Sequence, residues 1–509
     1  MSKVSSAPAL MLEYSPVVVA IIALALYPLY CFVCPTASGL PVVNRKRPWE
    51  LFSTSAKRRF LCDSAELIRE GRSSNTAAFY IMTDMGPRLL LSGEHAEHFE
   101  DSSKFNTFPI RNEELLLNIP GLEVNIGAGS WHNHAMNGAV AAMTRKLAGV
   151  TAYSIPALEK EASEAVAALL PSDSADSWHD VCLYDAMVEI VARLSSLVFV
   201  GEELARNPEW LKIAIDFTWV RVNAVTSLHL WPAPLRPLVH WFFPSFRKLR
   251  VLVKEASRLI GPALERERST KGAQDGAGKS AFTALAWIDE QSNGRRYDAT
   301  LAQLRLAFAA VHSTTDMLCK LILTLCKHPE TIQLLREEVC TVLGERGATN
   351  TTLQQLVLMD SVMKESQRLQ PVSIATVHRH AAKDVTLPNG IYIPKGTKVA
   401  LTNTHMSDES IYDNATTFDA HRFVRMRRDP ARASAAPFAS SSVQHQGFGY
   451  GASTCPGRFF VAGEVKVILS LLLLNYDFKL PDGAQTQCRE TGFVRICDTT
   501  ARLSMRRRN

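Results

Sequence analysis

The feature that constrains this chain most is one cysteine, Cys455, in a glycine-containing turn directly before a long apolar helix predicted at Val461–Leu474. The turn spans residues 448–460 and has the sequence FGYGASTCPGRFF. Its glycines allow positive φ, and the free amide groups at a helix start stabilise a thiolate, which is a metal ligand. No partner cysteine or histidine stands at zinc spacing, which disfavours a four-ligand zinc site. A single axial thiolate instead predicts haem iron, and the alternative is a buried cysteine at a helix start.

Length and composition indicate a large globular protein. The chain has 509 residues, of which 47% are hydrophobic and 21% charged, and these shares exclude wholesale disorder and a multi-span membrane protein. The net charge of +6 is too weak for a dedicated nucleic-acid binder, so we expect no nucleic-acid partner. Ten cysteines at irregular spacing exclude a disulfide scaffold and fit a reducing compartment.

An uncharged apolar stretch near the N-terminus predicts a membrane anchor. Residues Val17–Cys34 would span about 27 Å as a helix, close to the thickness of the endoplasmic reticulum bilayer. Basic residues follow at 45–47 and 57–59, so the positive-inside rule places the larger part in the cytosol. The alternative is a cleaved signal peptide, which the thin N-terminal charge disfavours. We therefore expect a lumenal segment 1–16, a single-pass endoplasmic reticulum anchor 17–34, a linker 35–50 and a haem domain 51–509.

Hydrophobic periodicity predicts a mainly α-helical domain with small β-sheets late in the sequence. Apolar residues recur at helical spacing over Ala157–Leu170, Phe246–Leu264, Leu301–Cys326 and Glu330–Leu343. Short β-rich runs separated by turn residues occupy Val385–Ala400, and the tail Tyr476–Ser504 has the pattern of further strands. The polar, glycine-rich stretch Ser269–Ser280 is expected to be a loop.

The cysteine turn resembles the haem-binding loop of the cytochrome P450 superfamily, whose pattern is F-x-x-G-x-R-x-C-x-G. Phe448, Gly451, Cys455 and Gly457 match this pattern, so the resemblance implies that Cys455 is the axial ligand of haem b. Ser453 replaces the family's arginine, which normally binds a haem propionate. The resemblance covers nearly the whole chain, and in its narrower form it points to ent-kaurene oxidase-like enzymes of secondary metabolism in filamentous fungi.

A second motif of the family, E-x-x-R, is matched by Glu365 and Arg368. Their spacing places both side chains on one side of a helix, where an acid and a base can pair. A third segment, Phe418–Phe423, matches the family through Arg422. The resemblance implies a buried network of Glu365, Arg368 and Arg422 that braces the haem loop and is not catalytic. For E-x-x-R alone, a solvated helix pair is the alternative.

The helix predicted at Leu301–Cys326 resembles the family's oxygen-activating helix. The pattern A-G-x-(D/E)-T-(T/S) falls on residues 309–314, so the resemblance assigns proton delivery to His312, Ser313 and Thr314. His312 replaces the usual acid and Ser313 the usual threonine, and both side chains can still relay protons. Two alternatives stay open: His312 as a hydrogen-bonded helix histidine without a catalytic part, and Thr314 acting in place of Ser313.

The serine at position 453 means that another group must hold the haem propionates. His132 and His134 are candidates, as is Arg145, because the family's W-x-x-x-R helix falls at Trp131 and lacks its arginine here. Surface histidines are the alternative interpretation. Weak propionate anchoring would make haem release faster than in a Ser453→His variant.

The substrate-contact regions implied by the resemblance are mostly apolar and predict a hydrophobic, terpenoid-type substrate. The expected pocket residues are Phe308, Ala309, Val372, Ile374, Ala375 and Phe493. The apolar segment Leu228–Phe243 fits either a membrane-dipping loop or ordinary core packing. Arg458, Lys466 and the cluster Arg425–Arg428 are candidates for a basic face that docks an acidic reductase.

The resemblance therefore implies a membrane-anchored haem-thiolate monooxygenase that uses O2. Electrons would come from NADPH through a separate NADPH-cytochrome P450 reductase, since only 509 − 455 = 54 residues follow Cys455, too few for a flavin module. One alternative is a haem-thiolate isomerase or cyclising enzyme without a reductase, because the altered pair His312–Ser313 would change proton delivery. The other is a haem-binding protein without catalysis.

Overall fold

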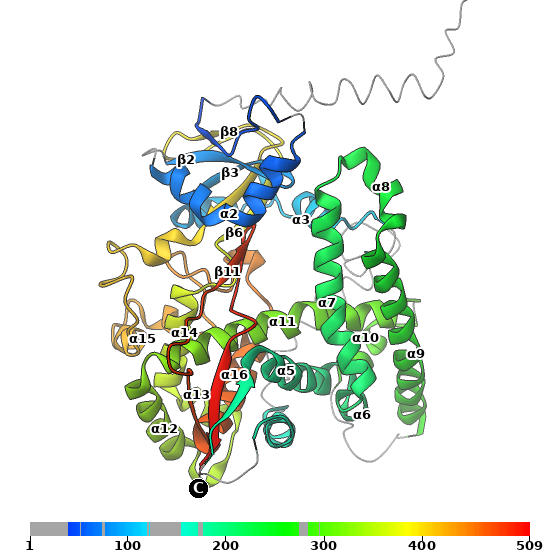
Figure 1. Ribbon diagram of the computed structural model, residues 1–509, viewed down its shortest axis with the longest axis vertical. Coiled ribbons are helices and arrows are strands. Elements are labelled where there is room, and N and C mark those ends of the chain that lie inside the picture. Colours follow the sequence, from blue (N-terminus) through cyan, green and yellow to red (C-terminus); the bar gives the residue numbers. More distant parts are fainter. Residues whose placement is uncertain are drawn as a thin grey trace, which may run out of the picture.

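The computed structural model describes residues 39–50, 52–73, 77–119, 122, 154–171, 177–273, 283–294 and 296–508 (Figure 1). The predicted anchor Val17–Cys34 and the propionate candidates His132, His134 and Arg145 lie outside these ranges. Within them, one helix is long and apolar enough to cross a bilayer, α11 (Ala299–Cys326), and 72% of its apolar window is buried. Such burial is typical of the core helix of a folded domain.

The largest sheet of the described part joins early and late segments of the chain at one end of the molecule (Figure 1). Its strand order is β1-β2-β3-β9-β6-β4. The strands are β1 (Val42–Val43), β2 (Ala78–Thr83), β3 (Gly86–Ser92), β4 (Phe105–Asn106), β6 (Ala375–Ala381) and β9 (Lys398–Thr402). β2 and β3 form an antiparallel hairpin, and β3 runs parallel to β9. The helix α2 (Thr54–Ser73) packs against β2.

The early strands correct the expectation that sheets are confined to the late sequence. β2 has the sequence AFYIMT and is almost entirely buried. A short, continuous apolar run lacks alternation, so periodicity cannot separate a buried strand from a helix. β1 lies within the segment expected as a linker, where it pairs with β2. The Asn44 side chain donates to Ala56 O at 2.8 Å and Met82 O at 2.7 Å, so residues 42–44 of that segment are packed into the folded domain.

The strands expected late in the sequence are confirmed. β7 (Val385–Thr386) and β8 (Tyr392–Ile393) form a small hairpin before β9. In the tail, β10 (Tyr476–Lys479) and β13 (Arg502–Arg507) form a three-stranded sheet with β5 (His179–Cys182). β11 (Arg489–Thr491) and β12 (Val494–Ile496) form a further hairpin.

The prediction of a mainly α-helical domain is also confirmed. The remaining α-helices with defined bounds are α3 (Phe108–Leu115), α5 (Leu183–Val200), α6 (Glu202–Ala205), α7 (Pro208–His229), α8 (Arg236–Val239), α9 (Pro244–Ala273), α10 (Ala284–Gln291), α12 (Pro329–Leu343), α13 (Asn350–Gln355), α14 (Val357–Leu369), α15 (Arg422–Arg427) and α16 (Arg458–Asn475). Residues 154–169 are helical as well. α9 continues to Ala273, so the loop expected at 269–280 does not begin at residue 269, and residues 274–280 lie outside the described ranges.

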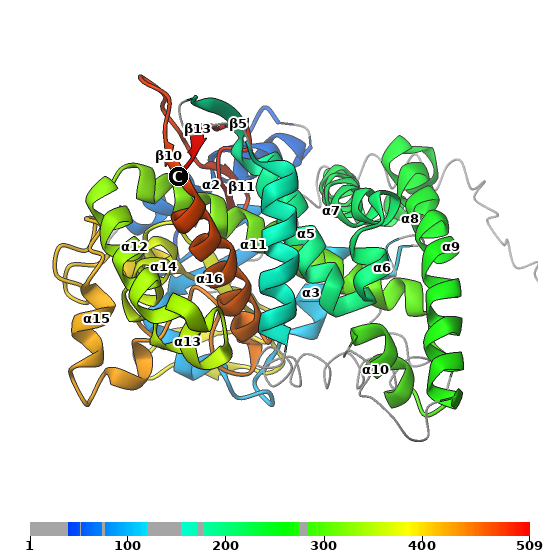
Figure 2. The same ribbon diagram turned by 90° about the horizontal axis from the view of Figure 1, so that it is seen from below.

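The helix α11 runs through the centre of the helical body and contacts α5, α7, α9, α14 and α16 (Figures 1 and 2). Asp298 caps its start by accepting a hydrogen bond from the Leu301 backbone N–H at 2.9 Å. Most of its C-terminal half is buried, whereas Ala309 and Ser313 are exposed. Ala309 and Ser313 lie one turn apart, so they form one exposed strip on this otherwise largely buried helix.

Candidate active site

The cysteine turn is held by its own backbone. Gly449 and Gly451 adopt φ values of 80° and 61°, which a residue with a side chain rarely takes. The Cys455 backbone N–H donates to Phe448 O at 2.8 Å and closes the turn. α16 begins at Arg458, whose guanidinium donates to Cys455 O at 2.9 Å. These contacts fix Cys455 just before the helix start.

The surroundings of Cys455 shift its pKa in two directions. Burial raises the pKa of the Cys455 thiol and is the larger effect. The backbone N–H groups of Gly457 and Arg458, with the charges of Arg458 and Arg111, lower that pKa. A bound metal ion would favour the thiolate decisively, because its charge stabilises the anion far more than N–H groups do.

One face of α11 combines a small residue with a hydroxyl. Ser313 Oγ donates to Ala309 O at 2.8 Å, and both residues are exposed. Thr314 is only 1% exposed, and its Oγ1 has no hydrogen-bond partner among the described residues. Ser313, rather than Thr314, therefore presents the hydroxyl on this face. Its Oγ can exchange the bond to Ala309 O for a bond to a ligand.

His312 lies on a different side of α11. Its Nε2 donates to Ile215 O at 2.8 Å, and its Nδ1 accepts from the Tyr184 hydroxyl at 2.8 Å. The Trp219 ring packs edge-on against the imidazole, with 5.3 Å between the ring centroids. Burial lowers the pKa of His312, which favours the neutral ring. His312 thus bridges α5, α7 and α11, and this placement favours the hydrogen-bonded helix histidine over the proton relay.

Glu365, Arg368 and Arg422 form a buried ionic network. Arg368 donates to both carboxylate oxygens of Glu365 at 2.8 Å, and Arg422 Nε reaches the same oxygens at 3.0 and 3.1 Å. The side chains of Glu365 and Arg368 are fully buried. Arg368 also donates to Met406 O at 2.5 Å and Ala415 O at 2.6 Å. The network ties α14 to the segment that precedes the cysteine turn.

A cavity of about 300 Å³ lies beside the cysteine turn. Ser453 lines it together with Arg111 of α3 and with His378 and Arg379 of β6. Arg379 donates to Phe99 O at 3.1 Å and His378 O at 3.0 Å, which fixes the guanidinium at the cavity. The two arginines supply next to Ser453 the positive charge that a serine lacks.

Local motifs did not reveal these two arginines. The W-x-x-x-R pattern, which is local in sequence, points to His132 and His134 instead. Arg111 and Arg379 are 379 − 111 = 268 residues apart, and they meet because α3 packs against β6. The sequence feature that could have revealed Arg379 is the basic pair His378–Arg379, which stands in a β-rich run after the E-x-x-R helix.

The structure places the six expected pocket residues in two groups. Phe308 and Ala309 lie on α11 beside Ser313. The others lie near the sheets: Val372, Ile374, Ala375 and Phe493. The Phe493 ring packs edge-on against Phe60, with 4.9 Å between the centroids. Of these six residues, only Phe308 and Ala309 therefore lie on the same helix as Ser313.

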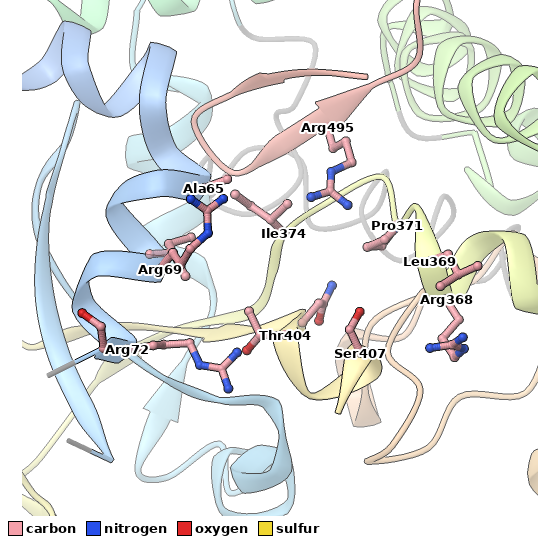
Figure 3. Close-up of a pocket in the computed structure, with 13 residues that line it drawn as sticks. Ala65, Arg69, Arg72, Arg368, Leu369, Pro371, Ile374, Thr404, Ser407 and Arg495 are labelled. Atoms are coloured by element: carbon pink, nitrogen blue, oxygen red, sulfur yellow. The ribbon is translucent and has the colours of Figure 1, made fainter. Parts of the chain in front are cut away.

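A second cavity, of about 590 Å³, opens between α2, the end of α14 and β12 (Figure 3). Arg69 and Arg72 border it from α2, and Arg495 extends into it from β12 (Figure 3). Ile374 is part of its wall. Neither Cys455 nor any residue of α11 lines this cleft, so it is separate from the site around α11.

The residues around α11 and the cysteine turn fit a haem group. Cys455 offers the axial thiolate, and the small Ala309 leaves room on the opposing helix. The charge of Arg111 contributes to the pKa shifts of both Cys455 and Arg305, so Arg111 lies close to the cysteine turn and to α11. Arg111 and Arg379 can bind the propionates. This set of one thiol, two guanidinium groups and a small-residue helix face matches what haem requires.

Comparison with known proteins supports the interpretation of this site as a haem site. The cytochrome P450 family model matches residues 130–500 of this chain. The chain belongs to the cytochrome P450 family. Cytochrome P450 monooxygenase cdmJ of Talaromyces verruculosus is 42% identical over 489 residues, which cover 96% of this chain and 93% of that protein. The fumitremorgin C monooxygenase of Aspergillus fumigatus is 40% identical over 474 residues, 93% of this chain and 92% of the relative.

A third relative, cytochrome P450 monooxygenase roqO of Penicillium rubens, is 41% identical over 92% of each chain. This P450 is a monooxygenase, as the sequence resemblance predicted. The family implies a haem-thiolate iron as its cofactor.

Proposed function

We propose that this P450 is a membrane-anchored enzyme of fungal secondary metabolism that hydroxylates, or repeatedly oxidises, a hydrophobic terpenoid-type compound. The observation that carries the proposal is Cys455 in its turn before α16, together with the small, hydroxyl-bearing face of α11. Similarity to a monooxygenase named for fumitremorgin C supports a specialised small molecule as the substrate. O2 is the co-substrate, and a separate NADPH-cytochrome P450 reductase supplies electrons.

Each residue of the site has a distinct role in this proposal. Haem, when bound, would supply the chemistry that activates dioxygen, and the Cys455 thiolate would hold its iron. Ser313 holds a proton on Oγ at the exposed face of α11. His312 keeps that face oriented, because it ties α11 to α5 and α7. Arg111 and Arg379 bind the cofactor's carboxylates.

Exposed aromatic side chains support the proposed attachment to a membrane. Trp241 and Phe242, just after α8, are 57% and 85% exposed, and Trp49 is 74% exposed. The two regions are neighbours, because Lys57 Nζ near the start of α2 donates to His229 O at 2.6 Å. Exposed aromatic residues suit the interface of a bilayer. The proposed anchor at residues 17–34 precedes Trp49 in sequence and would join the membrane at this surface.

Basic residues on α16 and around α15 support docking of an acidic reductase. Arg458 starts α16 beside Cys455, and Arg425 and Arg428 are exposed on and after α15. Lys466, expected on the same face, is instead buried and pairs with Asp360 at 2.7 Å. The proposed docking face therefore consists of arginines and does not include Lys466.

The test is a carbon monoxide difference spectrum of the reduced full-length protein in membranes. We expect a red-shifted Soret band that Cys455→Ser lacks and that Cys62→Ser, a change at an exposed cysteine of α2, retains. Haem without this band in the unmodified protein would contradict the thiolate assignment. Product formation that requires NADPH and reductase then separates a monooxygenase from an isomerase, which turns over without them.

A further inference from the structure

A buried arginine on α7 has no acidic partner in the described part of the chain. Arg221 is 1% exposed. Its Nη2 donates to Leu115 O and Leu122 O, both at 3.3 Å, and its Nε has no hydrogen-bond partner among the described residues. Burial alone lowers the pKa of Arg221 to about 10. Two long bonds to neutral carbonyls do not compensate a buried positive charge.

Arg221 lies over the helix that carries the reaction face. Its guanidinium carbon is 5.0 Å from the centroid of the Phe308 ring. Phe308 directly precedes Ala309, the exposed neighbour of Ser313 on α11. A group held at Arg221 is therefore held beside the exposed face of α11 that carries Ala309 and Ser313.

A second cation lies on the same face of α11. Arg305, Ala309 and Ser313 are spaced four residues apart and so share one side of the helix. Burial lowers the pKa of Arg305, and the nearby charge of Arg111 lowers it further. No ion pair of Arg305 is found within the described residues. This face of α11 consequently carries positive charge that the described residues do not neutralise.

Two other arginines that are only 1% exposed are each paired with a carboxylate. Arg88 binds Glu114 at 2.8 Å, and Arg368 binds Glu365 at 2.8 Å. Arg221 is as deeply buried as these two, but its hydrogen-bond partners among the described residues are carbonyl groups and not a carboxylate. Because a buried charge without a partner is costly, its persistence beside the reaction face points to an anionic group that arrives with a ligand.

We propose that Arg221, supported by Arg305, binds a carboxylate of the substrate, so that the enzyme acts on a hydrophobic acid. A guanidinium group binds a carboxylate through two parallel hydrogen bonds, and the unpartnered Nε of Arg221 is free to provide one of them. The apolar remainder of the substrate would lie along Phe308 and Ala309. This inference rests on the proposed monooxygenase function and adds the chemical class of the substrate.

The test uses imidazole-tailed acids with the haem-loaded full chain. The imidazole ligates the iron and shifts the Soret band, and an alkyl chain then extends the carboxylate from the iron toward α7. Each ω-(imidazol-1-yl)alkanoic acid, over a series of chain lengths, is compared with its methyl ester. We expect at least one acid to bind about tenfold or more tightly than its ester, the gain that a charge-assisted hydrogen bond provides.

Matched variants assign this preference to Arg221. Arg221→Gln should abolish it, and Arg305→Gln should reduce it. Lys212→Gln removes the same charge from an exposed position on the same helix and should leave the preference unchanged. If Arg221→Gln fails to take up haem, Arg221→Lys replaces it; lysine keeps the charge but not the bidentate geometry, so the preference should fall without vanishing.

Equal binding of acid and ester at every chain length would overturn the inference. An undiminished preference for the acid in Arg221→Gln would also overturn it. Where Arg221→Lys is used in place of that variant, an undiminished preference in Arg221→Lys has the same meaning. The absence of a Soret response to any imidazole would instead refute the haem assignment. The failure of this inference is therefore distinguishable from the failure of the proposed function.

Discussion

Replacing Glu365 by glutamine removes the charge at the centre of the buried network while keeping the shape of the side chain. Three N–H groups of Arg368 and Arg422 donate to this carboxylate over 2.8 to 3.1 Å. Both arginines remain buried in the variant and lose their counterion. Removing one partner of a buried ion pair costs about 3–5 kcal/mol. Because domains are stable by only about 5–15 kcal/mol, we expect Glu365→Gln to lose a large share of its unfolding free energy.

The measurement is urea unfolding of the full chain, followed by far-ultraviolet circular dichroism and by Soret absorbance. Glu66→Gln is the matched control, since Glu66 pairs with Arg69 at the same spacing of three residues on α2. The side chains of that pair are 68% and 70% exposed, so its loss should change the unfolding free energy by less than about 1 kcal/mol. An effect of Glu365→Gln no larger than that of the control would refute the interpretation of the network as a desolvated ion cluster.

The site itself allows further tests. Ser313→Ala should lower the product formed per NADPH and raise hydrogen peroxide release, whereas Ser313→Thr should preserve coupling; equal coupling in all three proteins would exclude a role for the hydroxyl. Burial lowers the pKa of His312, so below about pH 6.5 the unfolded chain binds a proton that the folded chain excludes, and the unfolding free energy falls as the pH drops. Urea titrations at neutral and acidic pH should show a shallower slope for His312→Gln, and an unchanged slope would contradict this assignment. Ser453→His should release haem to apomyoglobin several-fold more slowly, because the histidine adds a propionate contact to those of Arg111 and Arg379; equal rates would mean that the two arginines already anchor the propionates.

The parts of the site that the sequence predicts well depend on neighbours along the chain. Cys455, its glycines and the following helix lie within one short segment, so their spacing is informative without a structure. Glu365 and Arg368 are three residues apart, and helical geometry alone brings them together. The long helices were predicted for the same reason, because their periodicity is a local property.

The other parts depend on contacts between distant segments. A helical motif shows that His312 and Ser313 point in different directions, but only the packing of α5 and α7 shows which of them stays exposed. Arg221 is one arginine in an apolar helix, and its burial follows from the position of Phe308 and of the segment near Leu115. Sequence patterns do not identify such a residue, because an arginine exposed on the surface of a helix can have the same neighbours in sequence.

The position of β3 between β2 and β9 has a consequence for synthesis of the protein in a cell. The partners Leu89 and Val399 are 399 − 89 = 310 residues apart, and a ribosome adding about 5–20 residues per second needs roughly 15–60 s to cover that interval. Throughout that time the β2–β3 hairpin has an unpaired apolar edge, which is a template for aggregation. A chaperone that covers this nascent edge should therefore raise the yield of folded enzyme.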